Sequence, residues 1–184
     1  MILKISNLLS RFKHANQGVA AVEFALILPL MLLIYLGTLE ASRAISYHNR
    51  IISITSALGD LVAQTENNIT STMLNDYFKA AQTIIAPYPA TEVKQIITNV
   101  YVNPAGQTSI VWSRGFNGGS PRSAINLPAN IIDVAKDNYV IISEASLAYQ
   151  PMITYIFPGN LDFYQIFYHL PRAGSCIGLN GSCP

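Results

Sequence analysis

Charged residues are scarce in this chain of 184 residues. Asp, Glu, Lys and Arg make up 11% of the sequence, whereas soluble domains carry about 25% of these residues. Eleven basic residues against ten acidic ones give a formal net charge of +1. Because binding to phosphates needs a basic surface, this balance predicts no nucleic-acid partner. Hydrophobic residues make up 51% of the sequence, which excludes an intrinsically disordered chain.

Metal ligands and catalytic motifs are also lacking. The two cysteines and three histidines are too few for a disulfide-rich scaffold, and they lack the paired spacing of a structural zinc site. His48 lies far along the chain from His14 and His169, and no carboxylate completes a ligand set around it. No phosphate-binding loop, nucleophile elbow or Cys–His pair occurs. We therefore predict no catalytic residue, no metal and no cofactor, and we expect a protein that is not an enzyme.

What the sequence does contain is one long apolar run. Residues 19–39 include a single charged side chain, Glu23, and a helix of this length spans about 30 Å of hydrocarbon. Residues 1–18 contain three basic residues and no acidic one, so the positive-inside rule predicts a cytoplasmic N-terminus with the rest of the chain outside. A cleaved secretory signal is disfavoured, because its apolar core has only about 7 to 15 residues.

Glu23 is the informative residue of this run. A carboxylate in the middle of a membrane costs about 2.5 to 3.5 kcal/mol on insertion scales. If the chain were cut between Gly18 and Val19, the new α-amino group would lie one helical turn before Glu23 and pair with it, within one subunit or between neighbours. The helix dipole would also favour an acid in the first turn. The alternative is an acid tolerated near the membrane interface, and the residues alone leave both readings open.

The residues around Glu23 resemble a known processing site. The string GVAAVEF at residues 18–24 resembles the cleavage site of type IV prepilins, in which the peptidase cuts after the glycine and the fifth mature residue is glutamate. The run VEFALILP, with Phe24 after the acid and Pro29 early in the helix, is similar to the TadE-like minor pilins of the tight-adherence (Flp) pilus system. The resemblance covers residues from about 11 to 40.

This resemblance implies specific roles for the residues of the motif. Gly18 and Val19 would flank the bond cut by a prepilin peptidase, and Glu23 and Phe24 would serve processing and subunit pairing. Pro29 removes one backbone donor and is expected to kink the helix. The implied partners are the peptidase, other pilin and minor pilin subunits, the inner-membrane pilus assembly platform and the lipid bilayer. The implied location is the inner membrane with a periplasmic head, or outside the cell in the assembled pilus.

Beyond residue 39 the apolar pattern continues without a helix breaker. Apolar side chains recur at three- and four-residue steps, which is typical of an amphipathic helix. We predict a single helix from Val19 to about Ala63, with a bend or an early end at Gly59 as the alternative, because glycine costs about 1 kcal/mol of helix propensity relative to alanine. The expected apolar face consists of Ala41, Ala44, Ile45, His48, Ile51, Ile52, Leu58, Leu61 and Val62.

The rest of the chain predicts a small α+β head. A second helix is expected over 72–85, with an apolar face that includes Met73. Turn residues at 103–107 between two β-rich runs predict a hairpin, which favours antiparallel pairing. A short helix at 128–135 and strands at 138–149 and 163–170 complete the list. The expected organisation is a leader at 1–18, a transmembrane helix at 19–39, its periplasmic extension at 40–66 and the head at 67–184.

Cys176 and Cys183 lie seven positions apart near the C-terminus. The predicted topology places them outside the membrane, where thiols are oxidised, and the glycines between them allow a small ring to close. A disulfide that ties down the tail is the favoured reading. Free thiols, or pairing between chains, are the alternatives.

Three functions fit the sequence to different degrees. The leading hypothesis is a noncatalytic minor pilin that takes part in pilus assembly, surface adhesion or biofilm formation. One alternative is an uncleaved single-pass envelope protein whose periplasmic head binds a partner protein or a polysaccharide. The other is a membrane-anchored enzyme, which a cluster of ionisable groups in a cleft of the head would favour.

Overall fold

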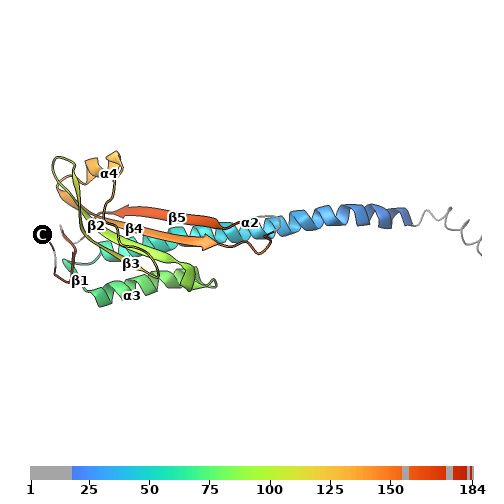
Figure 1. Ribbon diagram of the computed structural model, residues 1–184, viewed down its shortest axis with the longest axis horizontal. Helices are drawn as coiled ribbons and strands as arrows, with labels where there is room; N and C mark the ends of the chain where they lie inside the picture. The colour runs from blue at the N-terminus through green and yellow to red at the C-terminus, as the bar shows by residue number, and fades with distance from the viewer. Residues whose placement is uncertain (1–17, 155–157, 173–175, 182, 184) are drawn as a thin grey trace, which may run out of the picture. The chain divides into compact units, whose positions relative to one another are not determined.

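The structure is a computed structural model that describes residues 18–154, 158–172, 176–181 and 183. Contacts divide the chain into two compact units, Met1–Ser42 and Arg43–Pro184. Helix α2 runs from Val19 to Ala63 and contributes to both units (Figure 1). The predicted start and end of this helix are therefore confirmed, and the helix continues through Gly59.

The second unit contains a further helix, a sheet and several short elements (Figure 1). This mixture confirms the predicted α+β class. The elements after α2 are β1 (Asn68–Ile69), α3 (Ser71–Gln82), the 3₁₀ turns η2 (Thr83–Ile85) and η3 (Ala90–Glu92), β2 (Lys94–Val102), β3 (Thr108–Phe116), α4 (Ala129–Val134), β4 (Asn138–Tyr149), β5 (Leu161–His169) and β6 (Gly178–Leu179).

Four strands form an antiparallel sheet in the order β3-β2-β4-β5. Strands β2 and β3 are the predicted hairpin, and their register shifts once, between Asn99 and Val100. Strand β2 pairs with β4 over its whole length without a shift. A second pair, β1 with β6, is parallel. The sequence analysis did not predict this pair, because each strand has only two residues and the two lie far apart in the chain.

One face of the sheet packs against α2 and α3. Helix α3 begins at the N-cap Thr70, whose side chain accepts a hydrogen bond from the Met73 amide at 3.1 Å. Each large side chain buried here contributes about 1.5 to 3 kcal/mol to folding. The core contains Ile51, Ile54, Leu58 and Val62 of α2, Leu74 and Phe78 of α3, and Ile97, Trp112, Ile141, Leu147 and Tyr149 of the sheet.

Three side chains predicted for these apolar faces lie at the surface instead, and the smallest of them is Ala41. Ile45 is 60% exposed and Met73 is 40% exposed. Ile54 is fully buried although the expected face omitted it. Each helix therefore buries a narrower stripe than its sequence periodicity suggested, because a sheet covers only one side of it.

The opposite face of the sheet has a smaller core of its own. Val100 and Val102 of β2 and Val140 and Ile142 of β4 are buried there. The segment that contains α4 supplies the covering side chains, which include Leu127, Ile131, Ile132 and Ala135. The sheet is consequently buried on both faces, which explains the near-continuous apolar sequence of β4.

Gly59 allows α2 to approach the sheet closely. A Cβ atom added at Gly59 would lie 2.4 Å from His169 Nε2 and 2.6 Å from Ser143 Oγ. Neither distance is compatible with a carbon atom at that position. A glycine in the interior of a helix, which costs helix propensity, is here required by the packing of α2 on β4 and β5.

We predict that Gly59→Ala destabilises the head although alanine is the better helix former. The clash with His169 should outweigh the helix propensity and lower the free energy of unfolding by about 1 to 3 kcal/mol. Urea unfolding of the detergent-solubilised protein, followed by the fluorescence of its single tryptophan, measures the change. In a His169→Ala background, which removes the imidazole, the same substitution should cost less. Equal costs in both backgrounds would contradict the packing argument.

Candidate processing and membrane-anchor site

The predicted cleavage site lies at the beginning of α2. Gly18 directly precedes the helix, and a Cβ atom added there would meet nothing within 4 Å. Val19 is the first helical residue, and Glu23 follows it by four positions, so both lie on one face of the helix. The side chains of Val19, Glu23 and Phe24 are exposed.

Glu23 has no ion pair or hydrogen bond within the part of the chain that the structure describes. The first turn of α2 contains no acidic residue, because Glu23 is its fifth residue. The helix dipole acts mainly within the first turn, so its expected contribution at Glu23 is small.

The segment after Glu23 has the length and composition of a membrane-spanning helix. No part of its most apolar window is buried. The Thr38 hydroxyl donates a hydrogen bond to the Tyr35 carbonyl at 2.8 Å, so this polar group is satisfied inside the helix. Pro29 lies inside α2, near its N-terminal end, and the helix continues past it. Since proline has no amide hydrogen, one carbonyl of the preceding turn lacks its helical donor.

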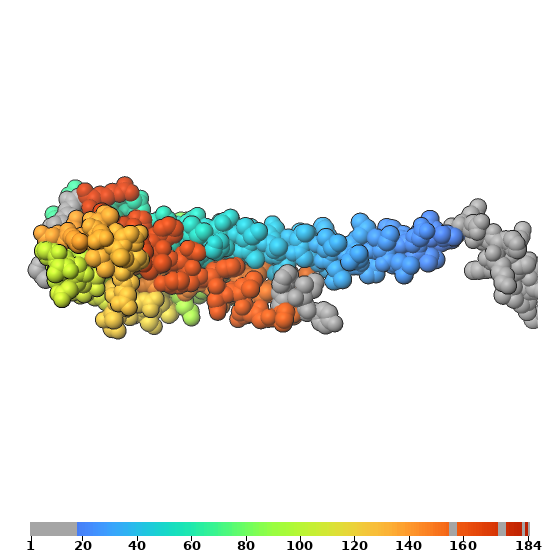
Figure 2. Space-filling view, turned by 90° about the horizontal axis from the view of Figure 1, so that it is seen from above, coloured from blue at the N-terminus to red at the C-terminus, as the bar shows by residue number. Residues whose placement is uncertain are grey.

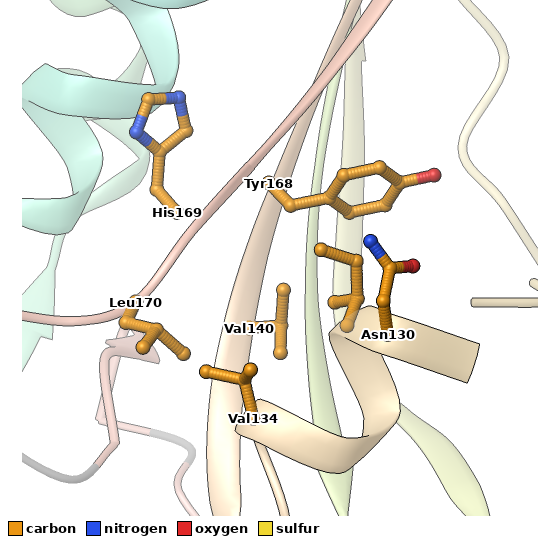
Figure 3. A pocket seen from close by; sticks show the side chains of 7 residues that line it. Asn130, Val134, Val140, Tyr168, His169 and Leu170 are labelled. Carbon is orange, nitrogen blue, oxygen red and sulfur yellow. The ribbon is translucent and has the colours of Figure 1, made fainter. Parts of the chain in front are cut away.

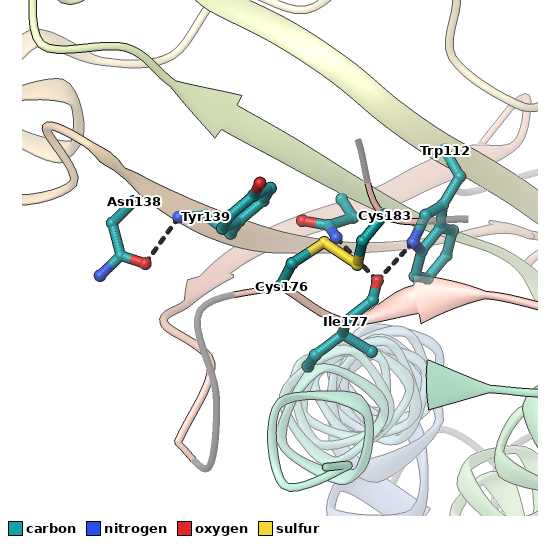
Figure 4. Close-up of a disulfide and its surroundings, with 7 residues drawn as sticks. Trp112, Asn138, Tyr139, Cys176, Ile177 and Cys183 are labelled. Atoms are coloured by element: carbon teal, nitrogen blue, oxygen red, sulfur yellow. Dashed lines mark hydrogen bonds between the residues drawn. A yellow bond between two sulfur atoms is a disulfide. The ribbon is translucent and has the colours of Figure 1, made fainter. Parts of the chain in front are cut away.

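The C-terminal tail is closed by the predicted disulfide between Cys176 and Cys183 (Figure 4). The tail also has a second attachment that the sequence analysis missed. The carbonyl of Ile177 accepts hydrogen bonds from Trp112 Nε1 at 2.7 Å and from Asn99 Nδ2 at 2.9 Å. Ile177 itself is fully buried. The chain's single tryptophan was the available signal, because a buried indole N–H needs an acceptor.

A buried carboxylate lies on the sheet face that α4 covers. Glu144 of β4 is 2% exposed and forms two hydrogen bonds with the guanidinium of Arg122, including one from Nε to Oε1 at 3.0 Å. The Tyr164 hydroxyl donates to Glu144 Oε2 at 2.6 Å. Burial and this hydrogen bond raise the pKa of Tyr164 to about 12. The Arg122 amide in turn donates to Ser113 Oγ at 2.8 Å.

These contacts fasten the loop after β3 onto the sheet. A Cβ atom at Gly119 would lie 2.3 Å from the Gln95 carbonyl oxygen, so the loop lies directly on β2. Both oxygens of Glu144 are occupied by Arg122 and Tyr164. The buried carboxylate therefore joins the loop, β4 and β5 in one hydrogen-bonded network. The one signal of this network in the sequence is Glu144, an isolated acid in an apolar strand.

His169 occupies a second polar site, at the C-terminal end of β5. Its Nε2 atom and the Oγ atom of Ser143 are both buried without a hydrogen-bond partner among the described residues. Burial lowers the pKa of His169, and Asp60 partly opposes this effect. Asp60 itself pairs with Arg172, whose amide donates to the Ala63 carbonyl at 2.8 Å at the end of α2.

A pocket of about 300 Å³ lies between α4 and β5 (Figure 3). Figure 3 shows the imidazole of His169 directed away from Val134 and Leu170, toward α2. The pocket is therefore mainly apolar. Its lining consists of Asn130, Ile131, Val134, Val140, Tyr168, His169 and Leu170. Within the described ranges, no group of three His, Cys, Asp or Glu side chains is placed to hold a metal ion.

Together these features define a protein with one apolar helix long enough to cross a membrane and an α+β head. Residues 18–57 match the family model described as TadE-like protein. The resemblance noted in the sequence is confirmed over this segment, which begins at Gly18 and extends into the part of α2 that the head covers. This family is associated with the tight-adherence pilus and is not known as enzymatic. No curated protein and no solved structure matches the chain.

We predict that Arg122→Ala destabilises the head, because it leaves Glu144 buried without its cation. The loss of charged hydrogen bonds should lower the free energy of unfolding by about 2 kcal/mol, and Tyr164→Phe should cost about 1 kcal/mol. Arg114→Ala is the matched control, since its side chain is exposed and has only a 3.5 Å contact with Ser71. Urea unfolding compares the three variants. A cost for Arg122→Ala no larger than that of the control would contradict the proposed role of the network.

Proposed function

We propose that this chain is a noncatalytic minor pilin of a tight-adherence type IV pilus. Residues 19–39 would anchor it in the inner membrane, with the N-terminus in the cytoplasm and residues 40–184 on the periplasmic side. The observation that carries this proposal is the position of Gly18 immediately before an exposed apolar helix whose fifth residue is Glu23. The match of residues 18–57 to the TadE-like family supports it.

In this proposal a prepilin peptidase cuts the bond between Gly18 and Val19. The bond lies next to the predicted membrane boundary, where a membrane peptidase has access to it. Cleavage would remove three basic residues and no acidic residue. The mature chain would then have 11 − 3 = 8 basic residues against 10 acidic ones, a formal net charge of −2. It would also create an α-amino group one turn before Glu23.

Glu23 then has a physical reason to lie in an apolar segment. Its carboxylate is costly in lipid and lacks a partner in the described part of the single chain. Pairing with the new α-amino group of the same chain or of a neighbouring subunit would offset this cost and set the register between helices. Phe24 would pack beside it. Other pilin subunits and the inner-membrane assembly platform are the partners that this mechanism requires.

The head would be the part displayed outside the membrane. Its disulfide suits an oxidising compartment, and this agrees with the orientation that the basic leader predicts. In this proposal the head serves pilus assembly, adhesion or biofilm formation rather than catalysis.

The first test is the N-terminus of the protein purified from cells with and without their prepilin peptidase. We expect the chain to start at Val19 only when the peptidase is present. Gly18→Ala should block or slow the cleavage, because a side chain at this position is expected to obstruct the peptidase. Intact mass and N-terminal sequencing measure both effects. A chain that starts at Met1 in all cells would overturn the pilin proposal and favour an uncleaved envelope protein whose head binds a partner protein or a polysaccharide.

The second test separates cleavage from assembly. Glu23→Ala should still be cleaved largely as the wild type is, but it should impair pilus assembly or subunit pairing, because no carboxylate remains to meet the α-amino group. Mass spectrometry reports cleavage, and the amount of sheared surface pili reports assembly. Thr38→Ala, in the same helix, is the control and should assemble normally. Normal assembly of the Glu23→Ala chain would refute the pairing role of Glu23.

A further inference from the structure

His169, at the end of β5, lies against the C-terminal part of α2. In both views β5 lies beside this part of the helix (Figures 1 and 2). A Cβ atom added at Gly59 would lie 2.3 Å from Cδ2 and 2.4 Å from Nε2 of the imidazole, so the ring is in contact with the helix backbone. All the residues of this contact belong to one compact unit, Arg43–Pro184.

Two polar atoms are buried at this contact without a hydrogen-bond partner, namely His169 Nε2 and Ser143 Oγ of β4. Both lie within 2.6 Å of the same point, the position of a Cβ atom on Gly59. A neutral imidazole tolerates this arrangement, because one of its nitrogens is a bare acceptor that the Ser143 hydroxyl can approach. An imidazolium carries N–H groups on both nitrogens and a positive charge. That charge would have to be buried against the helix, which is unfavourable without a counter-ion.

The charged groups that face His169 provide no free counter-ion. On the α2 side, the described residues of the groove beside the ring include two charged side chains, Asp60 and Arg172. These two form an ion pair with each other. On the α4 side, the described lining of the pocket contains no charged side chain. Its other titratable group, Tyr168, stays neutral, and burial raises its pKa further. A proton on His169 would therefore add a charge to a pair that is already balanced.

Burial lowers the pKa of His169, whereas Asp60 opposes this effect and Arg172 adds to it. A histidine in an unfolded chain has a pKa of about 6.5. As the pH falls below this value, the unfolded chain takes up a proton before the folded head does. The contribution of His169 to stability is therefore complete above pH 6.5, and it is lost as the pH falls toward the lower pKa of the folded head.

We propose that His169 is an acid-sensitive latch between α2 and the β4–β5 side of the sheet. The neutral ring holds these layers together, and its protonation loosens the packing of Gly59 on the two strands. The same change weakens the closure at the end of α2, where the Arg172 amide donates to the Ala63 carbonyl at 2.8 Å and the Arg172 guanidinium pairs with Asp60. The inference goes beyond the proposed function and does not rest on it, because it concerns the head alone.

Urea unfolding of the full-length protein in detergent, at pH 7.5 and at pH 5.0, tests the latch. Acid should raise the ratio of unfolded to folded protein more in the wild type than in His169→Gln, which cannot take up the proton. We expect the two rises to differ several-fold, with a limit of about 30-fold for a ring that stays neutral in the folded head at pH 5.0. His48→Gln, which removes the other histidine of the described head, is the matched control and should keep the larger rise. Equal rises in the wild type and His169→Gln would overturn the inference.

Peptide-resolved hydrogen exchange shows where acid opens the head. After correction for the intrinsic rates, residues 54–63 of α2 should lose protection at pH 5.0 in the wild type and retain it in His169→Gln. The β2–β3 hairpin is the internal reference and should stay protected in both chains. An equal loss of protection in all segments would indicate global unfolding instead of a latch, and it would overturn the inference.

A titration of the wild type keeps the inference testable if His169→Gln does not fold. The imidazole resonances can be followed by NMR, with His14→Gln and His48→Gln variants to assign them. We expect His169 to titrate with a midpoint below 6.5. A midpoint at or above 6.5 would show that the folded head accepts the proton readily, which would overturn the inference.

Discussion

Helix α2 has to satisfy two different surroundings along one continuous backbone. From Val19 to Leu39 its side chains are exposed and almost entirely apolar, so only a lipid environment or other apolar helices can cover them at low cost. From Ile51 to Ala63 one stripe of the same helix is buried in the core of the head. The helix suits both surroundings because its backbone hydrogen bonds are made within the helix. Only the type of side chain on its surface differs between the two parts.

The close packing of α2 on the sheet depends on small and polar residues as much as on the apolar core. Gly59 removes the Cβ atom that would collide with His169 and Ser143. On the far face of the sheet, Arg122 and Tyr164 satisfy a carboxylate that would otherwise make burial of Glu144 unfavourable. Gly59 lets α2 lie close to one face of the sheet, and the contacts of Glu144 hold the loop after β3 on the other face.

The proposed functions of the two ends of α2 follow from this division. In the proposed function, the exposed N-terminal part of α2 presents Gly18 to the peptidase and Glu23 to neighbouring helices. The C-terminal part, which is buried in the core of the head, connects the head to the membrane anchor.

Much of this protein can be predicted from its sequence, because the deciding interactions are local. The periodicity of apolar residues predicted the extent of α2 and the presence of the second helix, turn residues predicted the hairpin, and two nearby cysteines predicted the disulfide. The second helix was expected over 72–85, but α3 ends at Gln82 and a 3₁₀ turn follows over Thr83–Ile85. The residues from Gly18 to Phe24 indicated the family because the motif is contiguous in the sequence. The pairing of β1 with β6, the partners of Glu144 and the acceptor role of the Ile177 carbonyl could not be predicted. Each joins segments well separated in the chain, and only the packing of the sheet between its two covering layers brings them within hydrogen-bonding distance.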